Sequence, residues 1–290
     1  MFAEKANFPI SFMARELAVS SAGYRKWVSR QSAPPGRRDA ANLALLDEIT
    51  EIFESSHRNY GAPRVWKELR RRGRTVGVNR VTRLMADNHL VGKGGRRPFP
   101  RTTIADPAAT PAPNVLDRDF SAARPDATWV TDITYLRTGE GWLYLAAIVD
   151  CYSRLVVGWA TADHMRDELC LAALDDAIAR RDPPPGLIHH SDRGGQYTSY
   201  DYQGRLADND MICSMSHKGN CWDNAVAESL WATIKRELVN DKKWETRAEL
   251  DAALFEYIEV FYNRQRLHST LDYCTPDEYD RGYWSTPKAA

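Results

Sequence analysis

The sequence has no apolar run that approaches the roughly 20 residues needed to cross a bilayer. Its first residues, MFAEKANFPISFMAREL, lack the basic stretch and long apolar segment of a secretory signal. The five cysteines are scattered without a CxxC pair, which argues against a disulfide framework and a cysteine zinc site. These absences predict a cytoplasmic globular protein with reduced thiols and no membrane partner.

The chain also lacks net charge, because its 39 Lys and Arg residues are balanced by 39 Asp and Glu residues. The two signs are distributed unevenly, however. Residues 1–125 hold 22 of the basic and 12 of the acidic residues, whereas residues 126–290 hold 17 and 27. Such an asymmetry favours a phosphate-binding module followed by a carboxylate-bearing module. Chance clustering of solvated charges is the alternative.

Two short helices around a tight turn are expected near the start of the chain. Apolar side chains recur at helical spacing between residues 10 and 30, and Ser20 and Ser21 can cap the second helix. This arrangement is typical of a helix-turn-helix, although many helical hairpins never contact DNA. We assign residues 1–36 to this helix-turn-helix-like segment, which ends at a Pro-Pro-Gly breaker.

Residues 37–92 predict a basic, all-helical DNA-binding domain, with helices from about residue 38, from Pro63 and from Val78. Residues 64–83 contain eight Lys or Arg side chains, a density that favours phosphate contact over a solvated helix face. The DNA contacts predicted in this domain are Arg64, Arg70, Arg71, Arg80 and Arg83. Residues 93–125 are rich in Gly, Pro, Ala and Arg and predict a mobile basic linker.

From residue 126 the pattern changes to strands alternating with helices. Strands are predicted at 128–136, 141–149, 154–161, 186–191 and 211–214, and helices at 166–181, 200–208 and 223–240. This order is that of an α/β domain that begins with antiparallel strands, and we place it at residues 126–243. Residues 244–290 predict a C-terminal helix and a basic tail, in which Arg264 and Arg266 contact DNA or lie in a solvated loop.

Three carboxylates stand out in the α/β domain. Asp132 lies in the middle of an apolar strand, where a charge is unfavourable unless it is paired or bound to metal. Asp192 follows a strand, and the ends of α/β strands are where binding crevices form. Glu228 lies in a predicted helix, where Asn224 and Lys235 share its face. Hard cations such as Mg²⁺ prefer such oxygen ligands, so we expect structural roles for His189 and His190.

The residues around these carboxylates resemble the catalytic motifs of Asp/Asp/Glu transposases and retroviral integrases. The motifs are WVTDITY with Asp132, HSDRGGQY with Asp192 and SHKGNCWDNAVAE with Glu228. The 35-residue gap between the last two carboxylates and the position of Lys235 also match that pattern. The segments YGAPRVWKEL, VNRVTRLM and YNRQRLHSTL look like the second-frame protein of the bacterial insertion-sequence-three family. The resemblance covers nearly the whole chain.

The resemblance implies a ribonuclease-H-like integrase core in which Asp132, Asp192 and Glu228 are both catalytic residues and metal ligands. Asp132 would bridge two Mg²⁺ or Mn²⁺ ions, and Lys218, Asn224 and Lys235 would contact DNA. The enzyme would cut and join DNA at the ends of a mobile element in the bacterial nucleoid. It would act as a dimer or larger assembly on DNA, often fused to a first-frame helix-turn-helix protein. A DNA-binding regulator without catalysis and a ribonuclease of the same fold are the alternatives.

Overall fold

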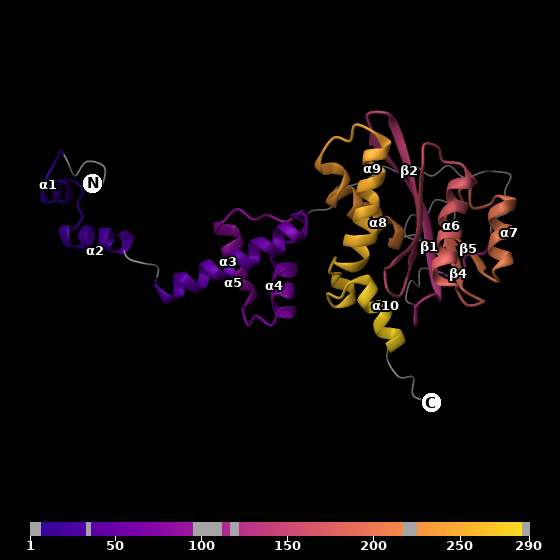
Figure 1. Cartoon of the computed structure of the whole chain (residues 1–290), viewed down its shortest axis with the longest axis horizontal. Coiled ribbons are helices and arrows are strands. Elements are labelled where there is room, and N and C mark those ends of the chain that lie inside the picture. The colour runs from indigo at the N-terminus through magenta and orange to yellow at the C-terminus, as the bar shows by residue number, and fades with distance from the viewer. Residues whose placement is uncertain (1–6, 33–35, 95–111, 117–121, 217–224, 286–290) are drawn as a thin grey trace. The chain divides into compact units, whose positions relative to one another are not determined.

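Figure 1 shows the computed structural model, which describes residues 7–32, 36–94, 112–116, 122–216 and 225–285. By its internal contacts the chain forms two compact units, residues 1–51 and residues 52–290. Within the described ranges, no helix is both long and apolar enough to cross a membrane.

The first unit is helical. It contains α1 (Ile10–Glu16), α2 (Ser21–Ser32) and most of α3 (Arg37–Ser55). The two short helices predicted between residues 10 and 30 are confirmed, and α1 packs against α2. The Ser20 hydroxyl accepts a hydrogen bond from the Gly23 amide at 2.9 Å, so it satisfies one of the donors left open at the start of α2.

The second unit begins with another helical pair, α4 (Ala62–Arg71) and α5 (Val78–Asp87), as the sequence predicts. Val65 and Leu69 on α4 and Val81 on α5 are fully buried, so the two helices pack through one apolar face each. The Trp66 indole donates a hydrogen bond to the Val76 carbonyl at 2.8 Å and fixes the turn between them.

A five-stranded mixed sheet forms the centre of the second unit, in the order β3-β2-β1-β4-β5. The strands are β1 (Thr128–Thr138), β2 (Gly141–Asp150), β3 (Val156–Ala162), β4 (Ile188–Ser191) and β5 (Ile212–Met215). The first three strands are antiparallel, and β1, β4 and β5 are parallel (Figure 1). The predicted α/β order with antiparallel strands first is therefore confirmed.

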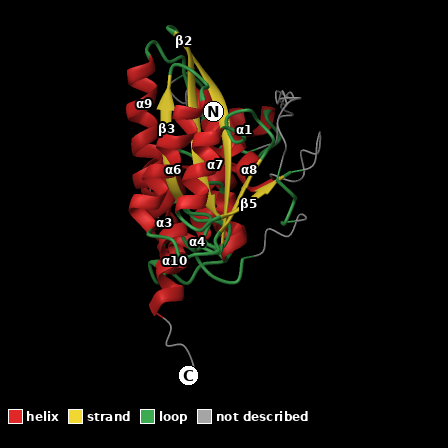
Figure 2. Cartoon of the chain, turned by 90° about the vertical axis from the view of Figure 1, so that its right-hand side faces the viewer, coloured by secondary structure: helices red, strands yellow, loops and turns green. Residues whose placement is uncertain are grey.

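Helices cover both faces of this sheet. One face carries α6 (Asp167–Arg181) and α7 (Tyr200–Asp208), and the other carries α8 (Ala225–Glu237) and α9 (Arg247–Phe255) (Figures 1 and 2). Because side chains alternate along a strand, Trp129 enters the core beneath α6 and α7, whereas Asp132 faces α8. The sheet thus presents an acidic side chain to α8.

The C-terminal region contains more helix than the sequence analysis anticipated. The helix predicted there divides into α9 and the π-helical segment η3 (Glu256–Tyr262), and α10 (Pro276–Ser285) follows it. Thr275 and Glu278 form a capping box at the start of α10. The Thr275 hydroxyl accepts a hydrogen bond from the Glu278 amide at 3.2 Å, and the Glu278 carboxylate accepts one from the Thr275 amide at 2.9 Å. The tetrapeptide Thr275-Pro276-Asp277-Glu278 is the sequence signal for this helix.

Some described residues of the predicted linker form hydrogen bonds within the second unit, and the linker itself stays a prediction. Lys93 donates to the Glu237 carbonyl at 2.7 Å, and the Pro113 carbonyl accepts from the Met215 amide at 3.2 Å. The Val115 amide donates to the Ser214 hydroxyl at 3.0 Å. The bonds of Pro113 and Val115 lie along the outermost strand β5, on the edge that no other described strand pairs with. Residues 95–111 and 117–121 lie outside the described ranges.

Close approach of β3 to α6 requires glycine at position 158. A Cβ atom there would lie 2.5 Å from the Ala173 carbonyl and 2.5 Å from the Ala177 amide. We expect Gly158→Ala to lower the free energy of unfolding by about 1–3 kcal/mol, because rigid backbone has to move. Gly204→Ala is the control, since no atom lies near that Cβ position on α7 and alanine favours a helix. Urea denaturation measures both, and equal midpoints would refute the packing argument.

Candidate active site

Asp132 lies in the middle of β1, where both of its carboxylate oxygens accept hydrogen bonds. The Trp231 indole on α8 donates to Oδ2 at 2.9 Å, and the Ile133 amide donates to Oδ1 at 2.8 Å. These two donors fix the orientation of the carboxylate while leaving lone pairs for a further partner. Asp132 is thus held in place by its own strand and by the facing helix.

Asp192 lies next to Asp132 because of the strand register. Strands β1 and β4 run parallel, and Val130 pairs with His190. Asp132 follows Val130 by two residues, and Asp192 follows His190 by two residues. Neighbouring strands are roughly 4.8 Å apart, which brings the two carboxylates to one level at the end of β4. The Gly194 amide donates to Asp192 Oδ1 at 2.8 Å and orients this side chain within the turn.

Glu228 reaches the site from the opposite direction. It is an exposed residue in the first turn of α8, one turn before Trp231, whose indole contacts Asp132. Residues three apart lie on one face of a helix, so Glu228 is on the side of α8 that faces β1. The joint role of Asp132, Asp192 and Glu228 as one site stays a prediction.

The electrostatics of Asp132 reflect this crowding. Burial raises its pKa, the negative charge of Asp192 raises it further, and Glu228 adds a smaller effect of the same sign. The hydrogen bonds from Trp231 and Ile133 oppose the change, and the resulting pKa is about 7. A carboxyl group whose ordinary pKa is near 4 is thus poorly ionised without a compensating positive charge.

The donor chemistry of these residues suits a hard divalent cation. All three side chains offer carboxylate oxygens, which Mg²⁺ and Mn²⁺ prefer, and a cation would relieve the repulsion that raises the pKa of Asp132. In the described parts of the chain, no three His, Cys, Asp or Glu side chains are grouped closely enough to form a ready metal cluster. The suitability of these three residues for a divalent cation is therefore inferred from their oxygen ligands and their negative charge.

Known protein families match both the helical region and the sheet-containing region of this chain. Residues 122–221 and 209–276 match two models described as an integrase core domain, and residues 40–98 match an HTH-like domain. The transposase InsF for insertion sequence IS3A of Escherichia coli (strain K12) is 38% identical over 282 residues, or 97% of each chain. The transposase for insertion sequence element IS904 of Lactococcus lactis is 39% identical over 85% of this chain and 97% of that one. This chain belongs to the IS3-type family of insertion-sequence transposases.

The expected fold of the transposase, an integrase core with helical regions before and after it, is confirmed by these matches. A chain in the solved intasome of simian T-cell lymphotropic virus is similar at 15% identity and a TM-score of 0.48. That likeness covers 83% of this chain and 76% of the viral one.

Lys235 lies on the same face of α8 as Trp231, one turn further along. Burial lowers the pKa of its ammonium group, and the negative charge of Asp132 raises it. Its Nζ atom lies 5.3 Å from the centre of the Tyr135 ring. Lys235 is thus close enough to Asp132 to be affected by its charge, and its contact with DNA stays a prediction. Lys218 and Asn224, the other predicted DNA contacts of this region, lie outside the described residues.

The two histidines before Asp192 have structural partners. His189 Nε2 lies 2.8 Å from the Tyr202 hydroxyl, and His190 Nδ1 lies 2.9 Å from the Ser214 hydroxyl. Both side chains are buried, and burial lowers the pKa of His189 to about 3, so its ring is neutral. The structural roles predicted for this pair are confirmed.

Two of the arginines predicted to contact DNA are engaged inside the transposase. Arg266 is 4% exposed and forms two hydrogen bonds with Glu237, at 2.7 Å and 2.8 Å. Arg64 donates to the Leu267 carbonyl at 2.9 Å and lies 3.8 Å from Glu237. A buried carboxylate requires such cations, which argues against direct DNA contact by Arg266 in particular.

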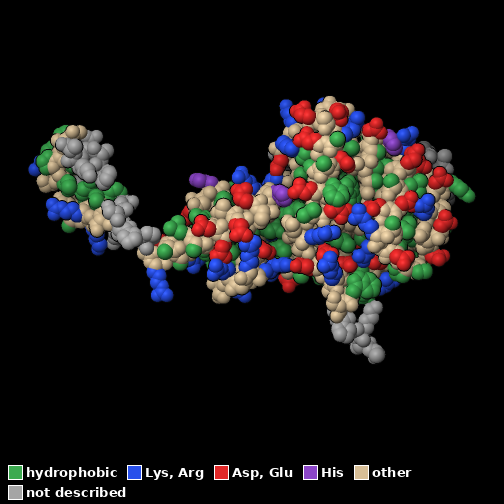
Figure 3. Space-filling model, viewed as in Figure 1, with side chains coloured by type: hydrophobic (Ala, Val, Ile, Leu, Met, Phe, Trp, Pro, Cys, Tyr) green, Lys and Arg blue, Asp and Glu red, His purple; other side chains and the backbone are tan. Residues whose placement is uncertain are grey.

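The other predicted arginines lie nearer the surface. Arg71 is ion-paired with Glu278 on α10, and Arg80 is partly buried. Arg70, Arg83 and Arg264 are exposed. Figure 3 shows basic and acidic side chains interspersed over the surface that it presents. DNA contact by the exposed arginines remains a prediction.

Trp231 is a further residue of the site that the carboxylate motifs do not point to. Trp231 is 6% exposed, and its indole is the direct hydrogen-bond partner of Asp132. Its position three residues after Glu228 is the available signal, since that spacing places both on one face of α8. A buried indole nitrogen also needs an acceptor, and Asp132 is the acceptor within reach.

Proposed function

We propose that this transposase cuts DNA at the ends of its insertion sequence and joins the freed ends to DNA, with Asp132, Asp192 and Glu228 as catalytic residues. The proposal is carried by Asp132, whose pKa is raised by burial and by the negative charges of Asp192 and Glu228. A strongly perturbed carboxyl group is typical of a catalytic site, and binding crevices form at the ends of α/β strands, where Asp192 lies. The family of the chain supports the reaction class, a polynucleotidyl transfer.

Each step of the proposed reaction exchanges one P–O bond for another. In cutting, a water oxygen attacks phosphorus and the bond to the 3′ oxygen breaks, leaving a 3′-hydroxyl and a 5′-phosphate. In joining, that 3′-hydroxyl attacks a second phosphodiester and loses its proton, while the displaced 3′ oxygen gains one. Each step forms one P–O bond for each one broken, so no external energy source is required.

The three carboxylates are the proposed ligands of two Mg²⁺ or Mn²⁺ ions. When bound, such ions stabilise negative charge on the attacking and leaving oxygens. Trp231 and the Ile133 amide hold the Asp132 carboxylate in one orientation, and the Gly194 amide holds Asp192. Lys235 supplies a positive charge for a DNA phosphate beside the carboxylates.

We extend the proposal to the domains and partners of the protein. Residues 1–36 and 37–92 would bind the element's DNA, and residues 126–243 would carry the chemistry. Residues 93–125 would connect them, and residues 244–290 would complete the core. Two DNA ends have to meet, so at least a dimer on DNA is expected. A first-frame helix-turn-helix protein is a proposed partner, and the nucleoid in the bacterial cytoplasm is the proposed site of action.

A strand-transfer assay tests this function. A labelled duplex that carries the element's own end is incubated with the protein and Mg²⁺, Mn²⁺ or EDTA, alone and fused to the first-frame protein. Metal-dependent cutting and joining supports the proposal. Cleavage of RNA–DNA hybrids in place of DNA would favour a ribonuclease. DNA binding without reaction by both forms would favour a regulator.

The raised pKa of Asp132 predicts how stability depends on pH and metal. The folded state holds its proton up to about pH 7, whereas the unfolded chain loses it near pH 4, so metal-free protein loses stability as pH rises between these values. We expect Asp132→Asn in EDTA at pH 8 to be more stable than wild type by about 2–4 kcal/mol. Mn²⁺ should raise the melting temperature of wild type and leave that of the variant nearly unchanged.

The exposed Asp87→Asn on α5 is the control for this thermal measurement, because it removes one charge far along the chain from the carboxylates. It should melt like wild type and keep the full response to Mn²⁺. An Asp132→Asn variant that is less stable than wild type at pH 8, or that responds fully to Mn²⁺, would contradict the proposed role of Asp132.

A further inference from the structure

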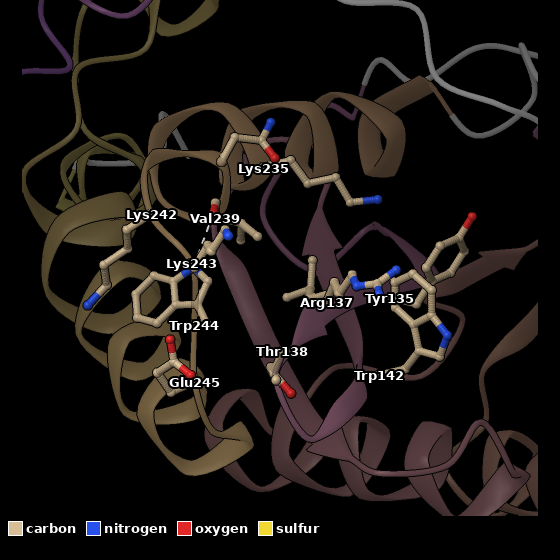
Figure 4. A pocket seen from close by; sticks show the side chains of 13 residues that line it. Tyr135, Arg137, Thr138, Trp142, Lys235, Val239, Lys242, Lys243, Trp244 and Glu245 are labelled. Atoms are coloured by element: carbon tan, nitrogen blue, oxygen red, sulfur yellow. Dashed lines mark hydrogen bonds between the residues drawn. The ribbon is translucent and has the colours of Figure 1, made fainter.

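A hollow of about 630 Å³ lies at the far end of β1 from its pairing with β4, and Figure 4 shows it from close by. Its walls are the ends of β1 and β2, the last turns of α8 and the segment that leads to α9. In Figure 4, Tyr135, Arg137 and Trp142 gather at one end, and Lys242 and Trp244 lie at the other. We call this hollow the hairpin groove.

Aromatic rings and cations alternate along the hairpin groove. Trp142 is 41% exposed and lies edge-on to Tyr135, with ring centres 5.0 Å apart. The Arg137 guanidinium lies 5.8 Å from the Trp142 ring, which is directly across the strand pair from it. At the other end, Lys242 lies 4.1 Å from the Trp244 ring.

The charge of the hairpin groove is predominantly positive. Its lining includes Arg137, Lys235, Lys242 and Lys243, and Glu245 is the acidic side chain among the lining residues. Lys242 is also paired with Glu249 at 2.8 Å, so part of its charge is already balanced. The remaining excess of positive charge suits a polyanion, and the exposed indole suits a flat ring.

The groove is a built feature, because the hairpin tip is fixed to the segment opposite. The Gly139 amide donates to the Trp244 carbonyl at 2.8 Å, and a Cβ at position 139 would lie 2.6 Å from the Glu245 carbonyl. Trp244 is buried, and its indole donates to the Val239 carbonyl at 3.1 Å. Both walls therefore keep their spacing without a ligand.

The hairpin groove continues from the catalytic carboxylates. Lys235 belongs to both, since Asp132 acts on its pKa and its side chain lines the groove. Tyr135 follows Asp132 by three residues, so its ring lies on the opposite face of β1, and the Lys235 Nζ atom lies 5.3 Å from that ring. Among the described residues, β4 pairs with β1 at Thr128–Val130, and no described strand pairs with this edge of β1 beyond Val130. A nucleic-acid strand leaving the carboxylates can follow that edge.

We propose that the hairpin groove binds unpaired nucleotides of the DNA strand that flanks the cut, with a base stacked on Trp142. This inference rests on the function proposed above. Paired bases already stack on their neighbours within a duplex, so an exposed indole favours bases released from pairing. Cations interleaved with aromatic rings are the composition of single-strand binding sites. Arg137 and Lys243 would neutralise the phosphates of the released nucleotides.

Equilibrium binding to two fluorescent duplexes tests the proposal. Both carry the element's end, but one is fully paired and the other has three mismatched nucleotides beyond it. Binding is measured in EDTA by anisotropy, and 2-aminopurine in the mismatched strand reports stacking. Wild type should prefer the mismatched duplex and quench the 2-aminopurine. Trp142→Ala should weaken binding to that duplex at least about fivefold and leave the paired duplex unchanged.

Three variants make the result specific. Trp142→Tyr should keep most of the preference, because it retains a stacking ring, whereas Arg137→Gln should weaken it. Trp284→Ala, at a tryptophan that is 55% exposed on α10, should bind both duplexes like wild type. A wild type without preference, a Trp142→Ala that keeps it, or equal weakening on both duplexes would each overturn the proposal. Melting temperatures verify that every variant is folded.

This binding test is separable from the proposed chemistry. Glu228→Gln should keep the full preference for the mismatched duplex, since Glu228 is not among the residues that line the groove. If the preference persists but wild type neither cuts nor joins DNA, the proposed function fails and the groove stands. If strand transfer proceeds without any preference, the groove proposal alone fails.

Discussion

Glu228→Gln is expected to reduce DNA cutting and joining by about a hundredfold to a thousandfold, while binding to the element's end stays within about twofold of wild type. Glutamine keeps the size of the side chain and removes the negative charge that holds a cation. Loss of one group that stabilises transition-state charge has an effect of this size. Single-turnover strand transfer with Mg²⁺, beside anisotropy on the same duplex, measures the two quantities.

The matched control is Glu168→Gln. Glu168 is also an exposed glutamate in the first turn of a helix, with a side chain that is 62% exposed, but it belongs to α6. It should cut and join DNA at the wild-type rate. Asp132→Asn and Asp192→Asn should match Glu228→Gln, and combining them should add little, because groups that act as one unit are not additive. A Glu228→Gln variant within tenfold of wild type would remove Glu228 from the proposed site.

The carboxylate site was predictable because each member follows a local rule. Asp132 alternates with apolar residues in a strand, Asp192 ends a strand, and Glu228 shares a helix face with Lys235. The parallel pairing of β1 with β4 then brings the first two together. That pairing joins segments about 60 residues apart in the sequence. The sequence therefore indicates the pairing only indirectly, through the α/β order of its strands and helices.

The direction in which the arginines point was not predictable. Tyr60-Gly61-Ala62-Pro63-Arg64 and the Arg266 segment are both basic and resemble family motifs, which favoured DNA contact. In the structure these segments contact one another, and the Tyr60 hydroxyl accepts from the Leu267 amide at 2.8 Å. Burial of a charge depends on a partner far away in the sequence. Glu237, the partner of Arg266, is separated from Arg64 by most of the chain.

Arg266→Met is expected to lower the free energy of unfolding by about 3–5 kcal/mol, the largest stability effect that we predict. The Glu237 side chain is completely buried, and Arg266 supplies two of its hydrogen bonds. Methionine fills similar space but leaves the carboxylate without its main counter-charge. The Tyr257 hydroxyl at 2.8 Å and the guanidinium groups of Arg236 at 3.5 Å and Arg64 at 3.8 Å are insufficient replacements, because neither arginine is within ideal hydrogen-bond distance. Urea denaturation at pH 7 measures the loss.

Two variants separate the ion pair from general packing. Arg264→Met, at an exposed position two residues earlier, should change stability by no more than about 0.5 kcal/mol. The double variant Glu237→Met with Arg266→Met should be more stable than Arg266→Met alone, because the uncompensated charge is gone. Equal stability of the single and double variants would show that packing, and not charge, dominates at this position.

The same pair determines how the protein responds to acid. Burial alone would raise the pKa of Glu237, but the hydrogen bonds and charge of Arg266 outweigh it and lower that pKa below its ordinary value. The resulting stability is present above about pH 4, the ordinary pKa of glutamate, and is lost as pH falls through the folded value. Glu237→Gln should therefore lose less stability than wild type between pH 5 and roughly pH 3. Parallel acid profiles would contradict this account.

The consequence for catalysis follows from the position of Glu237 on α8. That helix carries Glu228 in its first turn and ends at Glu237. The buried pair therefore anchors the C-terminal end of the helix whose N-terminal end presents the Glu228 carboxylate. As the temperature rises, the rate of strand transfer by Arg266→Met should fall more steeply than the rate of wild type, because α8 loosens before the core unfolds. Activity that follows the folded fraction alone would assign Glu237 and Arg266 to stability, without a part in positioning Glu228.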